Sequence, residues 1–382
     1  MKKYLSRLLS LVLIFSLAVP ILPVYADQSD PAAWVTVYLD GEKLRHPDAQ
    51  PCIMQDRTMV PIYQLTKALG ADVIWDGSLR TVTIARAGAT VLMTIDSKTA
   101  YVDGTAVAMD VAPCIVEDRT MIPAAYVALF FGQTVEWDGA TRTVYISEDK
   151  SVAGESNLEA WALPMGYYLN SPHKQFGGRP RSYVDAYDTT PEDILADSWG
   201  ITSREELIET VLSMTFAGHN DNFLHDADLV NNLSKAEYSQ LLSQAQGMDT
   251  YMWPLTKELS AKWGDRGILC WDLFRMRNLV QWGYMSGYVT YAEALVLLEP
   301  AVTLLKDNFS SWDEAFENYV DGYNWWARNN VLGQDTWDTS RGGHYQMYKK
   351  RYGSDFFNDA LFRQEIISVP GLTIDDILTT LL

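Results

Sequence analysis

An internal repeat with an offset of 62 residues constrains the fold of this chain more than any other sequence feature. The pattern Pro-Cys-Ile-x-x-Asp-Arg-Thr-Met begins at Pro51 and again at Pro113, and Trp-Asp-Gly begins at Trp75 and again at Trp137. In both copies an Arg-Thr-Val run follows. A pattern of this length that recurs at one spacing indicates that the same supersecondary unit is built twice.

Each copy of the repeat predicts the order β-β-α-β-β. Asp-Gly pairs mark turns between short strands, and a β-branched run after Trp-Asp-Gly predicts a returning strand. Pro61 suits the first position of a short helix, and Gly70 suits the left-handed residue that ends it. The two copies, about residues 37–86 and 100–148, predict one duplicated α+β domain over residues 33–148.

The N-terminus has the three parts of a secretory signal peptide. Lys2, Lys3 and Arg7 precede an uncharged run over residues 8–24, and small residues stand before a cleavage point after Ala26. An uncleaved membrane anchor is the alternative, but the run is short for a span and two prolines interrupt it. We expect residues 1–26 to be removed and the mature chain to be secreted or cell-wall-associated, with no stable membrane span.

Composition narrows the class of protein. A chain of 382 residues with 48% apolar and 21% charged residues is globular and long enough for two or three domains. Its net charge is −19 and becomes −22 once the three basic residues of the leader are removed. A nucleic-acid partner requires a basic surface, so nucleic acid is excluded. The three cysteines exclude a disulfide-dense mini-domain.

The second half of the chain reads as helical. Ten of the 13 tryptophans lie beyond residue 150, and helical periodicity replaces short strands. Thr202 with Glu205, and Thr290 with Glu293, predict helix starts by the capping-box pattern. The expected organisation has four parts: the duplicated domain, a linker over residues 149–157, an all-α domain of five to seven helices over residues 158–332, and an extension over residues 333–382 that packs on it.

Asp272 and Arg275 form the sharpest pair of candidate catalytic residues. They stand three residues apart on a predicted helix and therefore on one face. The apolar residues Ile268, Leu279 and Trp282 share that face. One interpretation is a partly buried ion pair that fixes how helices cross. The other is a carboxylate with a perturbed pKa that lines a pocket.

Metal-ligand types are concentrated between residues 219 and 228. His219, His225 and Asp226 are the candidate ligands there. The spacing matches neither a zinc-binding His-Glu-x-x-His helix nor a calcium loop, and Asp and Asn gather in loops for turn reasons alone. We therefore expect no metal and no cofactor.

Cys52 and Cys114 occupy equivalent repeat positions. In an exported protein they could form a disulfide across a pseudo-two-fold axis, or each could be a small buried apolar residue. Cys270 is left over, beside Trp271 on a predicted core helix.

Tryptophans of the helical half are candidate binding residues, because an indole can stack on the apolar face of a wall sugar. The candidates are Trp282, Trp325 and Trp326. Core packing is the alternative. Carboxylate pairs for glycoside cleavage cannot be singled out among 49 acidic residues, and Gly-x-Ser-x-Gly is absent.

The duplicated region resembles the copper amine oxidase N-terminal-like domain, or stalk domain, of secreted Gram-positive proteins. The resemblance rests on residues 111–123 and 134–146, with a weaker first copy. The oxidase chemistry of that family lies in a separate domain with copper-binding histidines and a tyrosine-derived quinone. Here the five histidines form no His-x-His pair, and the tyrosine motif is absent. The resemblance implies an extracellular spacer or binding module and not an amine oxidase.

The helical half resembles the bacterial domain of unknown function found in YbeU/YbeR-like proteins, over about residues 158–330. The resemblance rests on the runs that begin at Trp199, Cys270 and Trp282. It implies a fold and no chemistry. The sequence therefore predicts a non-catalytic envelope protein whose partner is a cell-wall polymer or another envelope protein. A wall-directed hydrolase that uses carboxylates of the helical domain is the alternative, and an assembly role in a homo-oligomer is a third reading.

Overall fold

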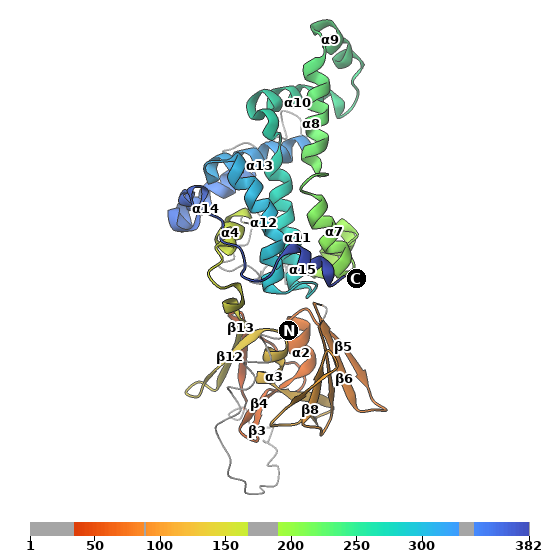
Figure 1. Cartoon of the computed structure of the whole chain (residues 1–382), viewed down its shortest axis with the longest axis vertical. Coiled ribbons are helices and arrows are strands. Elements are labelled where there is room, and N and C mark those ends of the chain that lie inside the picture. The colour runs from red at the N-terminus through yellow and green to blue at the C-terminus, as the bar shows by residue number, and fades with distance from the viewer. Residues whose placement is uncertain (1–33, 88, 167–189, 328–339, 382) are drawn as a thin grey trace.

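The computed structural model describes residues 34–87, 89–166, 190–327 and 340–381. The predicted signal peptide lies outside these residues. Two lobes are stacked along the long axis of the molecule (Figure 1). We call them the β domain, residues 34–148, and the helical domain, residues 150–381. The expectation of an α+β domain followed by an all-α domain is confirmed.

The β domain consists of three sheets and two short helices. The sheet orders are β12-β13-β1-β2, β10-β11-β4-β3 and β5-β6-β7-β8-β9. The elements are β1 (Thr36–Leu39), β2 (Glu42–Lys43), β3 (Cys52–Met54), β4 (Arg57–Pro61), α2 (Ile62–Ala68), β5 (Asp72–Asp76), β6 (Thr81–Arg86), β7 (Ala89–Thr94), β8 (Thr99–Val102), β9 (Thr105–Ala108), β10 (Cys114–Val116), β11 (Arg119–Pro123), α3 (Ala124–Phe130), β12 (Gln133–Asp138) and β13 (Thr143–Glu148).

The predicted order β-β-α-β-β is too simple. Four strands precede the helix in each repeat, because Gln55 and Asp56 both adopt positive φ (50° and 59°) and close a two-residue hairpin. Their counterparts in the second repeat do the same. Pro61 ends β4 and precedes α2, so it is not the first helical residue. Gly70 has φ +69° and ends the helix as predicted.

The two repeats are related by a pseudo-two-fold axis. β4 and β11 pair antiparallel, and Val60 lies opposite Ile122, its own counterpart 62 residues later. The pairs on either side of it exchange under the same offset: Met59 lies opposite Pro123, and Pro61 lies opposite Met121. Such reciprocal pairing is the signature of an isologous contact.

Two reciprocal ion pairs follow the same symmetry. Arg57 contacts Asp110 at 2.5 Å, and Arg119 contacts Asp48 at 2.8 Å. Each pair joins one repeat to the other. All four side chains are about half exposed, so the pairs contribute little stability and mainly set register.

The core between the repeats is also symmetric. We call it the junction cluster; its four pairs of residues are each related by the 62-residue offset, namely Ala49 and Val111, Cys52 and Cys114, Met54 and Val116, and Met59 and Met121. No disulfide joins Cys52 and Cys114 in the structure, and the pairing considered above stays a prediction that the thiol count below tests. The two cysteines lie on β3 and β10, the outer strands of the four-stranded sheet, and both contribute to the junction cluster.

The thiols are expected to react slowly in the native protein. Burial raises the pKa of Cys114 to about 11 and raises that of Cys270 well above its usual range, and the thiolate is the reactive form. A thiol reagent added without reductant should modify the folded protein slowly and should count three thiols after denaturation. A count of one would contradict the structure and indicate a disulfide.

The helical domain contains more helices than the expected five to seven. Its described elements are η2 (Lys150–Ala153), α4 (Leu158–Met165), α6 (Pro191–Trp199), α7 (Arg204–Ser213), α8 (His219–Asn232), α9 (Lys235–Gln244), α10 (Asp249–Trp263), η3 (Gly264–Arg266), α11 (Leu269–Met285), α12 (Tyr291–Asn308), α13 (Trp312–Ala327), α14 (Ser340–Phe356), η4 (Asp359–Arg363) and α15 (Ile374–Thr379). The predicted capping box of Thr290 and Glu293 is present at α12. The other is shifted by one residue, because Ser203 caps α7 at the N–H of Glu206.

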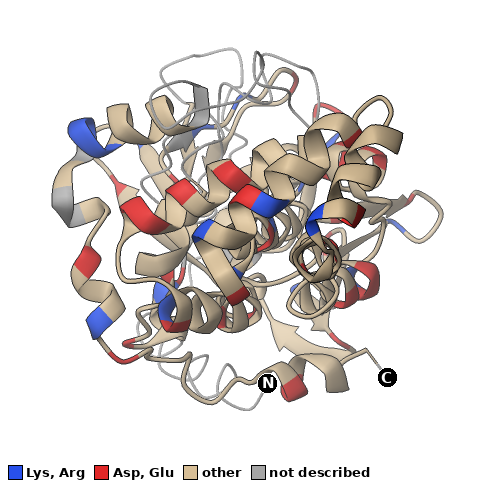
Figure 2. Cartoon of the chain, turned by 90° about the horizontal axis from the view of Figure 1, so that it is seen from above, with Lys and Arg blue, Asp and Glu red and all other residues tan. Residues whose placement is uncertain are grey.

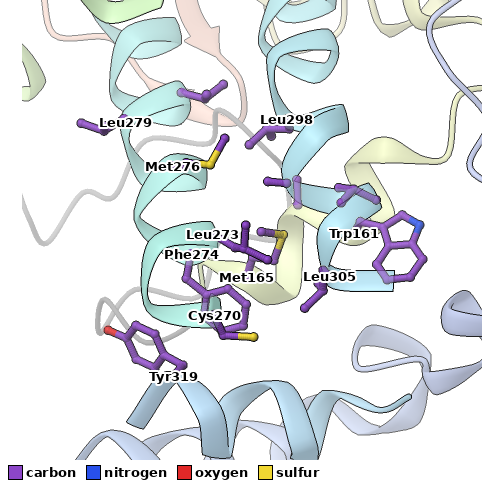
Figure 3. Close-up of a cluster of buried hydrophobic side chains, with 14 of the residues drawn as sticks. Trp161, Met165, Cys270, Leu273, Phe274, Met276, Leu279, Leu298, Leu305 and Tyr319 are labelled. Carbon is purple, nitrogen blue, oxygen red and sulfur yellow. The ribbon is translucent and has the colours of Figure 1, made fainter. Parts of the chain in front are cut away.

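Helix α11 is the centre of the helical core. Cys270, Leu273 and Phe274 project from it among side chains of α4, α12 and α13, including Trp161 and Tyr319 (Figure 3). The C-terminal extension joins the same core through residues of α14, η4 and α15, and the segment expected as a linker buries Ala153 there. The residues of the extension in this core include Tyr345, Phe357, Phe362 and Ile377.

The β domain meets the helical domain through backbone. Gly70, just after α2, lies so close to the turn after α11 that a Cβ built on it would be 2.4 Å from the carbonyl oxygen of Met285. A Cβ on Gly287 would lie 1.8 Å from the carbonyl oxygen of Gly70. The N–H of Ala87 donates to the carbonyl oxygen of Gly287. Two glycines with positive φ therefore allow the lobes to approach this closely.

Arg86 reinforces this contact from the β domain. Its side chain is buried and donates to the carbonyl oxygens of Leu69 and Phe131, at the ends of the two repeat helices. The guanidinium carbon also lies 5.5 Å from the ring centroid of Tyr284 in the helical domain. One side chain thus touches both repeats and the second lobe.

Candidate functional site

Asp272 lies at the N-terminus of another helix. Its Oδ2 accepts from the backbone N–H of Asn220 at 2.7 Å, in the first turn of α8. The side chain is 1% exposed. The first backbone N–H groups of a helix have no partner within that helix, and a carboxylate is well suited to accept from them. Asp272 therefore serves α8 as a cap supplied by α11.

Gly218 explains why α8 takes its cap from outside. It is the N-cap residue and has no side chain that could accept. A Cβ at this position would lie 2.2 Å from Oδ2 of Asp272, so any larger residue would push the carboxylate away. Sequence analysis missed Gly218; its signal was a glycine immediately before the His219 segment, which is a helix and not the loop that we expected.

The caps are exchanged between helices. Oδ1 of Asn220 accepts from the N–H of Ile268 at 2.6 Å, just before α11. Oδ1 of Asn318 on α13 accepts from the N–H of Cys270 at 2.9 Å, in the first turn of α11. Helices α8 and α11 therefore depend on each other for their N-terminal ends, and α11 also depends on α13, which ties the formation of both helices to tertiary packing.

Arg275 contacts both Asp272 and His219. Its terminal nitrogen lies 3.7 Å from Oδ1 of Asp272 and 2.7 Å from Nδ1 of His219. Arginine can only donate, so Nδ1 of His219 is the acceptor in this contact. The structure thus brings together two residues from separate predictions, the carboxylate pair and the metal-ligand segment.

An aromatic shell surrounds Arg275. The guanidinium carbon lies 4.4 Å from the ring centroid of Trp199 and 5.0 Å from that of Trp271. Trp326 packs against Trp271 at 5.1 Å and is 45% exposed. Two buried polar atoms here, Oδ1 of Asp272 and Nε1 of Trp271, have no hydrogen-bond partner. We call Trp199, His219, Trp271, Asp272, Arg275 and Trp326 the Arg275 cluster.

The other candidate tryptophans are less accessible. Trp325 is 8% exposed, and its indole N–H donates to Oγ1 of Thr256 at 2.9 Å, which fits the core-packing alternative. Trp282 is half-buried against the helical core. Of the three predicted binding residues, Trp326 is the most exposed, at 45%.

The candidate metal ligands are not brought together. His219 faces Asp272, whereas the side chain of His225 is 84% exposed and lies 3.8 Å from Asp226. The two histidines stand six positions apart on α8, which turns them to different faces. Within the described ranges, no three His, Cys, Asp or Glu side chains gather as a metal site requires.

Two hollows on the β domain share three pairs of lining residues that the 62-residue offset relates. The smaller, about 280 Å³, is lined by residues that include Pro61, Tyr63 and Arg119. The larger, about 410 Å³, is lined by residues that include the counterparts Pro123, Ala125 and Arg57, together with Trp137. Sequence analysis did not single out this place, although the repeated tryptophan was the signal that could have found it.

His46 borders the smaller hollow, and both of its ring nitrogens are buried without a hydrogen-bond partner. Burial disfavours the charged imidazolium and lowers the pKa of His46 to about 4. The unfolded chain therefore binds a proton at His46 between pH 6.5 and about 4, and the folded chain does not.

Stability is expected to fall as the pH drops through this window. The free energy of unfolding should decrease by up to about 3 kcal/mol between pH 6.5 and 4 on account of His46. The His46→Phe variant should flatten this dependence in urea titrations at several pH values. The exposed His225→Gln variant serves as the control, and an unchanged slope in His46→Phe would contradict the assignment.

Comparison with known proteins confirms both resemblances. Residues 38–146 match the family described as the copper amine oxidase N-terminal domain. Residues 194–354 match the family described as a protein of unknown function, DUF1266. The second match begins in α6 and ends in α14, so it includes the whole Arg275 cluster.

Two curated relatives come from Escherichia coli (strain K12). The uncharacterized protein YbeU is 27% identical over 169 residues, which are 44% of this chain and 70% of that protein. The uncharacterized protein YbeR is 24% identical over 132 residues, which are 35% of this chain and 56% of that protein. Neither name states an activity.

The described part of the chain contains no helix that combines the length and apolar character needed to cross a bilayer. Acidic and basic residues alternate along the helices in the view from above (Figure 2).

Proposed function

We propose that the mature chain is an exported envelope protein that binds rather than cleaves, and that its β domain is a rigid spacer for the helical domain. The observation that carries the proposal is the backbone contact between Gly70 and Gly287, because a contact this close holds two lobes in one orientation. The signal-peptide pattern of residues 1–26 and the acidic composition support an exported location.

The environment of the Asp272 side chain supports a binding function over hydrolysis. A carboxylate that acts on a polymer must reach the scissile bond, and glycoside cleavage needs a second carboxyl at a defined distance. Asp272 is 1% exposed, and one of its oxygens caps α8. Its environment accounts for it as a structural group.

The shape of the helical domain supports presentation. Helix α9 lies at the end of the molecule opposite the β domain (Figure 1) and contains no buried residue. A helix that contributes so little to the core is available to a partner. If the β domain is the part that attaches to the wall, it holds α9 away from the wall surface.

A sedimentation assay tests this function. Purified mature chain, residues 27–382, is mixed with Gram-positive cell walls, and both pelleted protein and released soluble glycan peptides are measured. We expect the protein to pellet and nothing to be released. Release that the Asp272→Asn variant abolishes without loss of folding would establish the hydrolase instead. A chain that stays in the supernatant refutes wall binding.

Cleavage of the predicted signal peptide is tested separately. N-terminal sequencing of the exported protein should give a sequence that begins at Asp27.

A further inference from the structure

We infer that the larger hollow of the β domain is a binding site for an uncharged pyranose sugar of a polysaccharide, with Trp137 as its stacking surface. The inference rests on the proposed function, because it names the substrate class that a wall-binding spacer would hold. The hollow has a volume of about 410 Å³, enough for one or two sugar rings.

Trp137 provides the flat apolar surface. Its ring is 45% exposed although it stands on β12, opposite the buried Val144 on β13. Ile53 and Val135 also line the hollow. An exposed indole beside aliphatic side chains matches the C–H face of a pyranose, which is apolar, and large aromatic rings bury much area at little entropic cost.

Polar groups lie at the edge of the same hollow. Asp56, Arg57 and Thr58 line it from the first repeat. The guanidinium of Arg57 donates to the carbonyl oxygen of Asp56 and pairs with Asp110, and a guanidinium has five N–H donors in all. Donors and acceptors around an apolar floor suit the ring of hydroxyls on a sugar. A proline-rich peptide would use the aromatic surface but offers few groups to these side chains.

The charged side chains around the larger hollow favour an uncharged ligand. Arg57 and Asp110 balance each other, and Asp56 adds a negative charge beside them. The whole chain is strongly acidic. An anionic polymer would be repelled over this surface, and an uncharged sugar would not.

Divergence between the repeats explains why only one hollow reaches its tryptophan. Trp75 is the counterpart of Trp137 and is equally exposed, at 44%, yet it does not line the smaller hollow. Tyr63 lines that hollow, where the second repeat has Ala125. A methyl group in place of a phenol ring leaves space between the helix start and the indole, which fits the difference between 280 and 410 Å³.

The test is calorimetric titration of the mature chain with two soluble probes, an N-acetylglucosamine tetrasaccharide and cellotetraose. At least one probe should bind. The Trp137→Ala and Ala125→Tyr variants should each weaken its affinity by about tenfold or more. Ala125 is exposed, so Ala125→Tyr should fold normally while it fills the hollow. Trp75→Ala is the matched control, because its indole sits over the same turn with the same exposure, and it should bind like the parent.

Several results overturn the inference. They are no heat with either probe up to millimolar concentration, equal losses in Trp75→Ala and Trp137→Ala, and binding of a proline-rich peptide at this site in place of sugar. Wall sedimentation separates this failure from that of the proposed function. If Ala125→Tyr still pellets like the parent, wall binding stands and lies at another surface.

Discussion

Replacement of Gly70 with alanine is expected to uncouple the two lobes. The new Cβ would lie 2.4 Å from the carbonyl oxygen of Met285, and that backbone cannot move without displacing the end of α11. Alanine at φ +69° adds strain of about 1–2 kcal/mol. With the steric term of about 1–3 kcal/mol, the total loss should be about 2–5 kcal/mol. Thermal unfolding should separate into two transitions, and small-angle scattering should show a more extended particle.

Gly132 provides a matched control inside the same molecule. It is the repeat counterpart of Gly70 and has nearly the same φ, +71°, but nothing lies within 4 Å of a Cβ built there. Gly132→Ala should therefore cost only the backbone strain of about 1–2 kcal/mol and leave the scattering profile unchanged. Equal effects of the two variants would show that the Gly70 contact does not hold the lobes together.

Removal of the Asp272 carboxylate is expected to destabilise the helical domain strongly. Asp272→Ala removes the oxygen that accepts from the N–H of Asn220 in the first turn of α8, and it removes the carboxylate that lies 3.7 Å from Arg275. Loss of one partner from a buried pair typically costs about 3–5 kcal/mol. Asp272→Asn keeps one oxygen that can accept from Asn220 and should lose about 1–2 kcal/mol. Urea unfolding followed by far-UV circular dichroism and tryptophan fluorescence measures both values.

Glu317→Ala is the control for charge removal. Glu317 pairs with Lys262 at 2.7 Å, but its side chain is 45% exposed, and Lys262 also contacts Asp321. Exposed pairs are worth about 0–1 kcal/mol, so this variant should unfold close to the parent. If Asp272→Ala proves as mild as Glu317→Ala, the cap from α11 is not what holds α8. An enzyme role for Asp272 would then regain support from any activity that this stable variant lost.

Local features of the fold were predictable from the sequence. Gly70 ends its helix, and Thr290 with Glu293 starts another, because these signals satisfy backbone groups within a few residues. The extra hairpin in each repeat was missed because Gln55 and Asp56 are unusual residues for two consecutive positive φ values.

The candidate site was predictable only in part. Asp272 and Arg275 were identified as a pair on one helix face, and the structure places them 3.7 Å apart. Neighbouring residues on a helix point about 100° apart, so Trp325 and Trp326 face the core and the solvent respectively. The packing of α13 decides which of the two tryptophans faces the core. Periodicity over a short window of sequence did not determine it.

By itself, the sequence determined that this chain builds one β unit twice and follows it with helices, since repetition and local hydrogen bonding are written in consecutive residues. Only the tertiary structure decided what the individual residues do. Asp272 caps a helix that begins 53 residues earlier, Cys52 and Cys114 lie unbonded on opposite sheet edges, and Trp137 lines a hollow that Trp75 does not. Each outcome depends on which distant backbone or side chain fills the space beside the residue, and no local pattern encodes that.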